Sequence, residues 1–161
     1  MKTKNNKDKS TLTTFYDDMK IYVFGNGNIS FDNFVKFYKE ILINFSSNSK
    51  INFIVCDFRG TDTLTIELLK SITPNVSIYH IGENPRYMPD TYKTKASQWL
   101  LKGGFTSDNE RDKNAIEACT HFIAIDFNSN EKRESGTQKN IQKCKNKGKI
   151  NLITQNYSVI T

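Results

Sequence analysis

Short apolar runs alternate along this chain with segments in which apolar residues recur every three or four positions. The recurring pattern predicts helices, the first capped by Ser30 and a later one opened by Thr61 or Asp62. The apolar runs predict strands at 21–24, 51–56, 76–81, 121–125 and 150–153. Strands separated by helices require crossover connections, which place strands in parallel. We therefore predict an α/β fold, a Rossmann-like parallel sheet of about five strands with helices on both faces.

The pattern is weaker at both ends of the chain and in its middle. Residues 1–18 are basic and lack an apolar face, so we expect a flexible tail. Residues 154–161 are expected to form an edge strand or a frayed end. The folded domain is therefore predicted to span 19–153. Within it, 82–95 is irregular, and a short helix is expected at 96–101 that the following Gly-Gly pair breaks.

Three of the predicted strands end in turns built from small or backbone-exposing residues. At the carboxyl edge of a parallel sheet such turns form the crevice in which nucleotides and other phosphorylated ligands bind. A helix N-terminus beside each turn would also direct free N–H groups at an anion. The candidate ligand contacts in these turns are Gly25, Asn26, Gly27, Arg59, Gly60, Thr61, Ser135, Gly136 and Thr137.

Each of these candidates also has an ordinary structural interpretation. A tight strand-to-helix turn explains the glycines, and helix capping explains Thr61 and Ser135. Arg111 either forms a surface ion pair with Asp112 or reaches the same crevice and clamps an anion. Three aromatic residues either close over the core or stack on a base, namely Tyr87, Tyr92 and Trp99.

Charge and composition narrow the classes of partner. The chain has 23 Lys and Arg against 17 Asp and Glu, a formal net charge of +6 that gathers in the tail and in the helix predicted at 136–147. Solvated surfaces explain these clusters better than nucleic-acid binding, because exposed aromatic residues are not interleaved with them. No apolar stretch approaches the roughly 20 residues of a membrane span. The N-terminus also lacks the apolar segment of a secretion signal, so we expect a cytoplasmic protein without a membrane partner.

Cysteine and histidine do not predict a metal centre. Cys56, Cys119 and Cys144 show no CxxC spacing, and they are expected to be free thiols in a reducing compartment. His80 and His121 are too few and too isolated for a set of metal ligands. We expect neither a metal nor a cofactor.

Taken in order, four segments resemble the SLOG superfamily, a Rossmann-like group that includes LOG-type cytokinin phosphoribohydrolases and the DNA-processing protein A. The segments are FGNGN, CDFRGTDTL, ERDKNAIEACTHFIAI and SGTQKNIQKCKNKGK. The likeness is strongest to small stand-alone bacterial and phage members, and it extends from Met19 to about Ile153. It implies a nucleotide or nucleotide-derived ligand held by the turn residues above and Arg111. It also implies a homodimer or higher homo-oligomer and a role in bacterial or phage conflict.

One position separates this chain from the catalytic branches of that superfamily. Those branches place a Glu after the glycine-threonine turn, as GTxxE, and this chain has Asn140 there. A neutral amide cannot act as general base or nucleophile in N-glycosidic cleavage. The resemblance therefore favours non-catalytic binding, by a sensor or a sequestering protein. The alternative is an N-glycosidic hydrolase or transferase acting on a nucleoside monophosphate, with its carboxylate supplied by Asp62, Glu67, Glu110 or Asp126.

Overall fold

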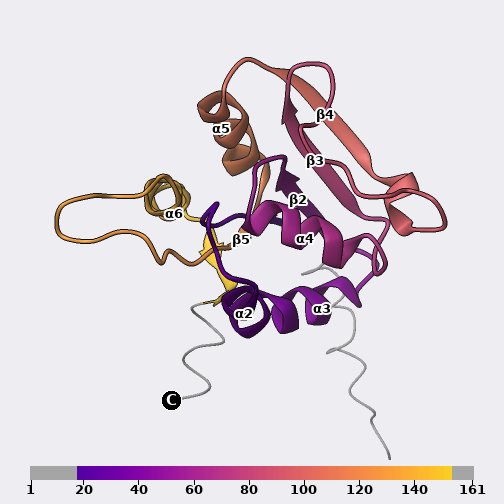
Figure 1. The fold of residues 1–161 in the computed structure, drawn as a ribbon, viewed down its shortest axis with the longest axis horizontal. Helices are drawn as coiled ribbons and strands as arrows, with labels where there is room; N and C mark the ends of the chain where they lie inside the picture. The colour runs from indigo at the N-terminus through magenta and orange to yellow at the C-terminus, as the bar shows by residue number, and fades with distance from the viewer. Residues whose placement is uncertain (1–17, 154–161) are drawn as a thin grey trace, which may run out of the picture.

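Six strands form one continuous sheet in the computed structural model, which describes residues 18–153 (Figure 1). Neighbouring strands are parallel throughout, in the order β4-β3-β2-β1-β5-β6. The predicted Rossmann-like α/β fold is confirmed, with six strands in place of about five. The strands are β1 (Lys20–Val23), β2 (Asn52–Cys56), β3 (Val76–Ile81), β4 (Leu100–Phe105), β5 (His121–Ile123) and β6 (Ile150–Asn151).

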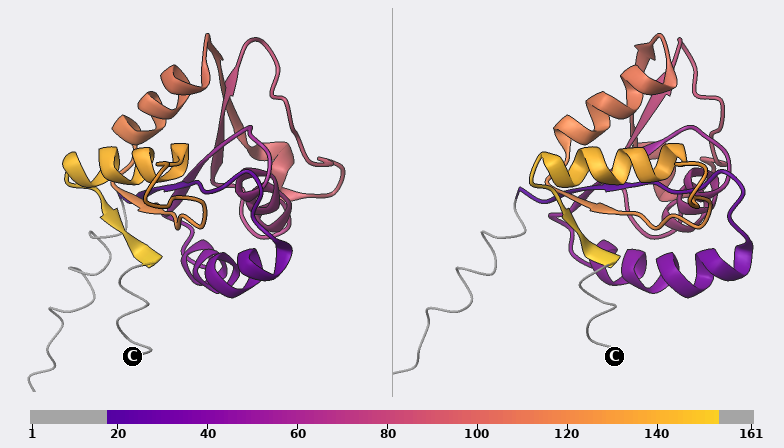
Figure 2. Two further views of the ribbon diagram at one scale, coloured as in Figure 1. Left: turned by 60° about the vertical axis from the view of Figure 1, so that its left-hand side comes forward. Right: turned by 90° about the vertical axis from the view of Figure 1, so that its left-hand side faces the viewer.

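Helices cover both faces of this sheet (Figures 1 and 2). The first helical segment is continuous, because a π-helical turn, η1, joins α2 to α3. The helices are α2 (Phe31–Phe34), η1 (Val35–Lys39), α3 (Glu40–Ser46), α4 (Thr61–Leu69), the 3-10 turn η2 (Lys95–Gln98), α5 (Asp108–Ala118) and α6 (Gly136–Asn146). None of the helices in residues 18–153 is both long enough and apolar enough to cross a bilayer.

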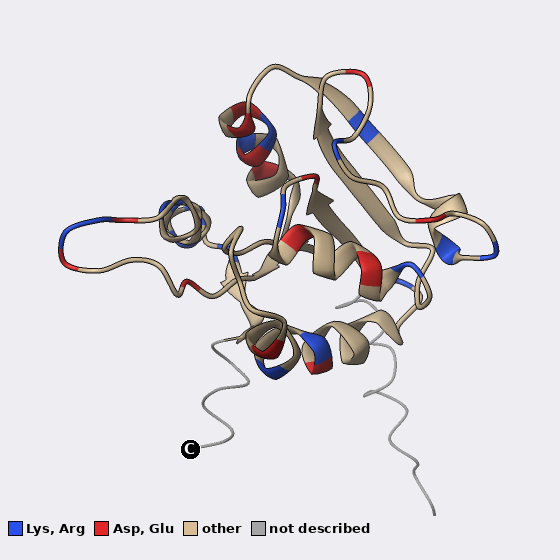
Figure 3. Cartoon of the chain, in the orientation of Figure 1, with Lys and Arg blue, Asp and Glu red and all other residues tan. Residues whose placement is uncertain are grey.

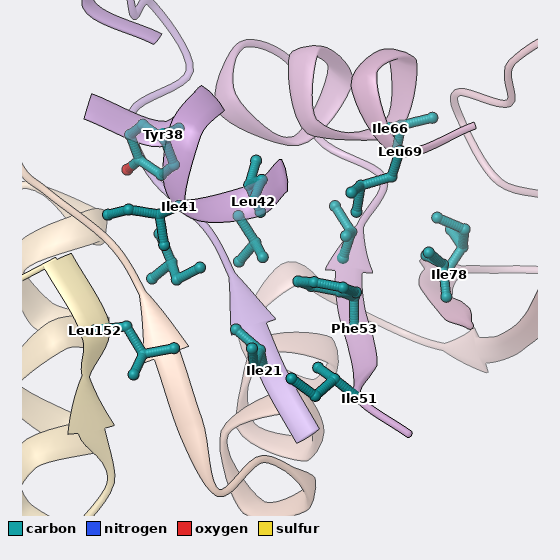
Figure 4. Close-up of a cluster of buried hydrophobic side chains, with 14 of the residues drawn as sticks. Ile21, Tyr38, Ile41, Leu42, Ile51, Phe53, Ile66, Leu69, Ile78 and Leu152 are labelled. Atoms are coloured by element: carbon teal, nitrogen blue, oxygen red, sulfur yellow. The ribbon is translucent and has the colours of Figure 1, made fainter. Parts of the chain in front are cut away.

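The two faces of the sheet bury separate hydrophobic clusters. Successive side chains of a strand point to opposite faces. Ile21 and Val23 of β1 therefore pack with α2, α3 and α4, whereas Tyr22 and Phe24 pack with α5 and α6. Figure 4 shows the first cluster, in which side chains from the sheet meet those of the helices. Because both faces are covered, the central strands are almost continuously apolar, as the sequence indicates.

The order of the strands fixes where a ligand site belongs. The chain adds β2, β3 and β4 on one side of β1 and then returns to place β5 and β6 on the other side. The connections after β1 and β5 therefore leave the sheet in different directions. In open α/β sheets a crevice forms at such a switch point, outside the carboxyl ends of the strands.

Most predicted helix starts are confirmed, including that of α4 at Thr61, but the N-cap of α4 differs from the prediction. Ser30 caps α2 by accepting a hydrogen bond from the N–H of Asn33 at 3.1 Å. The N-cap of α4 is Gly60, at φ 74°, so neither Thr61 nor Asp62 is the cap. A side chain at Gly60 would collide with the backbone of Gly27, since an added Cβ would lie 2.5 Å from its carbonyl carbon. Glycine is required here to bring two turns together.

The short helix predicted at 96–101 is confirmed only in its first half, because the 3-10 turn η2 covers residues 96–98 whereas Leu100 and Leu101 belong to strand β4. The turn η2 ends at Gln98, and Leu100–Phe105 then pairs with β3. The two glycines lie inside the strand, where the register shifts between Tyr79 and Ile81. Gly103 packs on the buried ring of His80, and an added Cβ would lie 2.1 Å from its Cε1 atom. The glycines therefore form a bulge in an edge strand.

Two strands are shorter than predicted. β5 ends at Ile123, and β6 comprises Ile150–Asn151, after which Leu152 and Ile153 are helical. The predicted tail up to residue 17 and the segment 154–161 lie outside the described residues.

Candidate functional site

A cavity of about 450 Å³ opens at the carboxyl ends of β1, β2 and β5. Eight of the ten predicted contacts lie on its wall, namely Gly25, Asn26, Gly27, Arg59, Arg111, Ser135, Gly136 and Thr137. Sequence reasoning did not select eight further wall residues as ligand contacts, namely Tyr22, Phe24, Asn28, Phe58, Asp108, Asp112, Asn128 and Arg133. Asp62 and Asn140 complete the wall. Because residues of all three predicted turns lie on this wall, the three turns meet at one cavity.

Asn26 joins these turns through its buried side chain. Its Nδ2 donates to Oδ1 of Asp126 at 2.9 Å and to Oγ1 of Thr137 at 3.3 Å. Its Oδ1 accepts from the N–H of Phe127 at 2.8 Å. Its backbone carbonyl accepts from the hydroxyl of Thr61 at 3.0 Å. One residue thus connects the ends of β1, β2 and β5 to the first turn of α6.

Gly60 and Thr61 do not lie on the cavity wall. Thr61 is fully buried and is occupied by its hydrogen bond to Asn26, while Gly60 packs against the turn after β1. Both residues therefore stabilise the rim of the cavity, formed by the turns after β1, β2 and β5, without lining the cavity themselves.

Tyr38 fixes the same rim from the helical side. Its hydroxyl donates to the carbonyl of Phe24 at 2.9 Å and accepts from the N–H of Ile125 at 3.0 Å. Burial raises the pKa of this phenol, so it remains a neutral donor and acceptor. The ends of β1 and β5 are therefore held at a fixed separation across the cavity.

Arg111 is a buried residue whose guanidinium is surrounded by carboxylates. Its Nη1 lies 3.0 Å from Asp57 and 2.7 Å from Asp108. Its Nε and Nη2 both donate to Oδ1 of Asp112, at 3.0 and 2.7 Å. Only 4% of Arg111 is exposed, so the expected surface pair with Asp112 is instead a buried network. Figure 3 shows the mixture of acidic and basic residues that α5 carries.

A second arginine ties the irregular segment to this network. Nε and Nη2 of Arg86 donate to the two carboxylate oxygens of Asp57 at 3.2 and 3.1 Å, and Nη2 also reaches Asp108 at 2.8 Å. Burial would raise the pKa of Asp57, but the hydrogen bonds from Arg86 outweigh it and hold that pKa below its usual value.

Arg59 and Arg133 differ from Arg111 in having no carboxylate partner among the described residues. Both are exposed and both line the cavity. The guanidinium of Arg59 lies over the ring of Phe58, 5.6 Å from its centroid. Arg59 belongs to the turn after β2, and Arg133 belongs to the loop between β5 and α6. These guanidiniums are therefore available to an anion.

The N-terminus of α6 completes the basic side of the cavity. Ser135 is its N-cap, accepting from the N–H of Gln138 at 3.0 Å and donating to Asp126 at 2.7 Å. Nothing lies within 4 Å of the position that a Cβ on Gly136 would occupy. The first backbone N–H groups of a helix lack partners within the helix, and its dipole favours negative charge there.

Asp126 organises the loop that leads to this helix end. Its carboxylate accepts from Asn26 and Ser135 and from the N–H groups of Asn128 and Ser129. Burial would raise the pKa of Asp126, but these hydrogen bonds lower it to about 2. The carboxylate is thus a fixed acceptor of the framework.

Two carboxylates on the cavity wall have contrasting environments. Burial raises the pKa of Asp62 to about 7, although Arg111 opposes the shift. Asp112 is fully engaged, since Arg111 holds one of its oxygens and Nδ2 of Asn140 donates to the other at 3.0 Å. Asn140 is therefore an amide on the cavity wall that binds a neighbouring carboxylate.

None of the three aromatic residues proposed for base stacking lies on the cavity wall. Trp99 is buried and donates from its indole N–H to the carbonyl of Thr73 at 2.8 Å, and the hydroxyl of Tyr87 contacts Glu67. Tyr92 is exposed outside the cavity. Phe58 is the partly exposed aromatic on the wall, and its place directly after the second strand was the available signal.

Within residues 18–153, no three His, Cys, Asp or Glu side chains are grouped in a way that suits a metal ion. The aspartates near Arg111 instead surround a guanidinium.

Comparison with protein-family models, with curated proteins and with solved structures found no match for this chain. The resemblance to the SLOG superfamily therefore rests on the quoted segments and stays a prediction.

Proposed function

We propose that this protein binds a nucleotide or a nucleotide-derived signalling ligand without turning it over, as a sensor or a sequestering protein. The observation that supports this most strongly is the convergence of three strand ends and the first turn of α6 on one cavity at the switch point of a parallel sheet. The volume of about 450 Å³ falls within the usual range of small-molecule sites.

The basic side of the cavity supports an anionic ligand. The phosphate lies at the N-terminus of α6, where Gly136 leaves space and the helix dipole favours negative charge. Arg59 and Arg133 reach it from the turns on either side, since neither has a carboxylate partner among residues 18–153. Arg111 takes no part in this binding, because its guanidinium is already shared among three aspartates.

The aromatic part of a nucleotide also has a matching surface. Phe58 is 36% exposed and lines the cavity beside Phe24. An aromatic ring offers a base a stacking surface that does not depend on sequence-specific hydrogen bonds. One cavity therefore offers surfaces that suit both the phosphate and the base of a nucleotide.

Non-catalytic binding is supported by the position of Asn140. Its amide lines the cavity and donates to Asp112, and an amide cannot take the role of the carboxylate that catalytic SLOG proteins carry there. A homo-oligomer, which the resemblance also implies, is tested separately by light scattering of the purified protein.

The experiment is to titrate the protein calorimetrically with AMP, GMP, CMP, UMP, ADP and cyclic di-AMP, and then to release the bound ligand by heat and identify it by mass spectrometry. Binding of at least one nucleotide, recovered intact, is the expected result. Failure of every nucleotide to bind would contradict the proposal, and so would recovery of free base.

A second candidate function is favoured by one specific observation. Asp62 and Asp112 both line the cavity, and burial raises the pKa of Asp62 to about 7, whereas Arg111 and Asn140 hold the two oxygens of Asp112. Two carboxyl groups with contrasting environments suit an acid and an ionised partner in N-glycosidic hydrolysis. In that reaction the N-glycosidic bond breaks as water adds to the anomeric carbon, Asp62 protonates the departing base, and the proton lost by the water returns to Asp62. Release of free base by the wild type, lost in Asp62→Asn, would establish this function in place of binding alone.

A further inference from the structure

Asp62 has a carboxylate oxygen that the fold leaves without a partner. The residue is 5% exposed and lies on the cavity wall. Its Oδ2 accepts from the N–H of Phe58 at 3.1 Å, whereas Oδ1 has no hydrogen bond within residues 18–153. In this part of the chain only Thr65 Oγ1 is both sealed from solvent and without a hydrogen bond. Oδ1 of Asp62 is therefore open to the cavity.

Fold stability does not explain a carboxyl group at this position. Burying a charge without a paired cation is costly, and burial raises the pKa of Asp62 to about 7. The single bond to the N–H of Phe58 would be made equally well by an amide oxygen. A ligand that donates a hydrogen bond to Oδ1 explains why a carboxyl group stands here, because it gives this buried acceptor the partner that it lacks.

The other acidic residues on the wall are already occupied. Asp112 binds Arg111 and Asn140, and Asp108 binds Arg86 and Arg111. These carboxylates make this wall unfavourable for phosphate, which is therefore directed to α6 and Arg59. The part of the ligand that meets Asp62 is therefore not anionic and donates hydrogen bonds.

We propose that Asp62 accepts hydrogen bonds from the ribose hydroxyls of the bound nucleotide, so that the cavity selects ribonucleotides over 2′-deoxyribonucleotides. This inference rests on the proposed function. The ribose is bonded directly to the phosphate and carries its hydroxyl donors within the same cavity. The base presents apolar ring faces, which suit Phe58 rather than a buried carboxyl group.

The test compares each of AMP, GMP, CMP and UMP with its 2′-deoxy counterpart by calorimetric titration at about pH 8. Because a hydrogen bond to a charged group contributes substantially to affinity, we expect the wild type to bind each ribonucleotide at least about tenfold more tightly than its 2′-deoxy counterpart. In Asp62→Asn, which keeps the shape and an acceptor for Phe58, the preference is expected to fall below about threefold. Asp32→Asn, an exposed acid in the first turn of α2, is the matched control and should keep the wild-type preference.

Proton release provides a second readout that a purely structural role would not give. Accepting hydroxyl donors stabilises the ionised carboxylate, so at about pH 6 binding should expel a proton from Asp62. Titrations in buffers of different ionisation heat measure this proton, and Asp62→Asn should release about one fewer. The charged and titratable groups that face Asp62 come from both faces of the sheet, namely Tyr22 of β1, Tyr38 of η1, Cys56 of β2, Asp57 directly after β2, and Arg111 and Asp112 of α5.

Failure of the inference is distinguishable from failure of the proposed function. Equal affinities for ribonucleotides and deoxyribonucleotides in the wild type would overturn the inference and leave nucleotide binding intact. A preference set by the base alone, or an undiminished sugar preference in Asp62→Asn, would also overturn it. Absence of binding to every nucleotide would overturn both.

Discussion

Asn26 donates a hydrogen bond from its Nδ2 to Oδ1 of Asp126, 100 positions further along the chain, at 2.9 Å. This bond joins the turn after β1 to the loop after β5, on the two sides of the switch point. The same amide reaches Thr137 at the start of α6. The site is therefore assembled by a buried polar contact between segments that the sequence keeps far apart.

Replacing Asn26 should loosen the whole rim. Asn26→Ala leaves the N–H of Phe127 and the carboxylate of Asp126 each short of a partner, so we expect a loss of about 2–3 kcal/mol in the free energy of unfolding. Urea unfolding measures it. Asn28→Ala, in the same turn but exposed, removes one surface hydrogen bond to Asn128 and should cost less than about 1 kcal/mol. Equal losses in the two variants would contradict the role of Asn26.

The raised pKa of Asp62 makes stability depend on pH. Its pKa, raised mainly by burial, moves from 3.8 to about 7 on folding, so between these values the folded state holds a proton that the unfolded state lacks. The contribution of protonated Asp62 to the free energy of unfolding is fully present below about pH 4 and is lost as the pH rises towards 7. We therefore expect Asp62→Asn to be more stable than the wild type by about 2–4 kcal/mol at pH 8 and nearly equal to it at pH 4. Urea unfolding at both pH values tests this, and an identical difference at the two would refute it.

Removing Arg111 should destabilise the protein more strongly than removing Arg86. Arg111→Met leaves Asp57, Asp108 and Asp112 close together without the buried cation, which typically costs about 3–5 kcal/mol. The side chain of Arg86 is 42% exposed, so Arg86→Met should cost clearly less. The comparison is made by urea unfolding at neutral pH. A milder effect for Arg111→Met than for Arg86→Met would show that Arg111 does not hold the aspartates together.

Much of this architecture was accessible from the sequence because apolar periodicity reports burial directly. Apart from the exposed Asn52, the run Ile51–Cys56 is apolar on both faces of its strand, as expected where helices cover both sides of a sheet. The pair Gly103-Gly104 was misinterpreted as a helix stop, because its contact with His80 depends on a neighbouring strand that sequence alone does not place.

The convergence of the turns was likewise predictable, but the role of Arg111 was not. Parallel strands end at one edge, so small residues after β1 and β2 were expected to meet. The aspartates around Arg111 come from the turn after β2 and from α5, and their distances depend on how α5 packs across the sheet. No local pattern reports that packing. Arg111 lines the cavity as predicted and in addition holds three carboxylates, of which the sequence indicated only Asp112.

Arg59 and Thr137 should contribute to nucleotide binding without being needed for folding. Arg59 is exposed and has no carboxylate partner within residues 18–153, so Arg59→Ala removes a cation from the cavity at little cost to stability. Thr137→Ala removes a wall hydroxyl that accepts a 3.3 Å hydrogen bond. Each variant should weaken nucleotide affinity by about tenfold while thermal unfolding stays within a few degrees of the wild type. Unchanged affinity in both variants would count against the site.

Gly136 permits the most direct test of the central claim that an anion binds at the start of α6. An added side chain there meets open space, so Gly136→Glu and Gly136→Gln should both fold, and the acid should favour the helix N-terminus. The measurement is calorimetric titration of the wild type and both variants with AMP, GMP, CMP and UMP. We predict that the wild type binds, that Gly136→Gln retains weakened binding, and that Gly136→Glu loses it through charge repulsion while unfolding at an equal or higher temperature. Binding by Gly136→Glu as tight as that of the wild type would contradict the account.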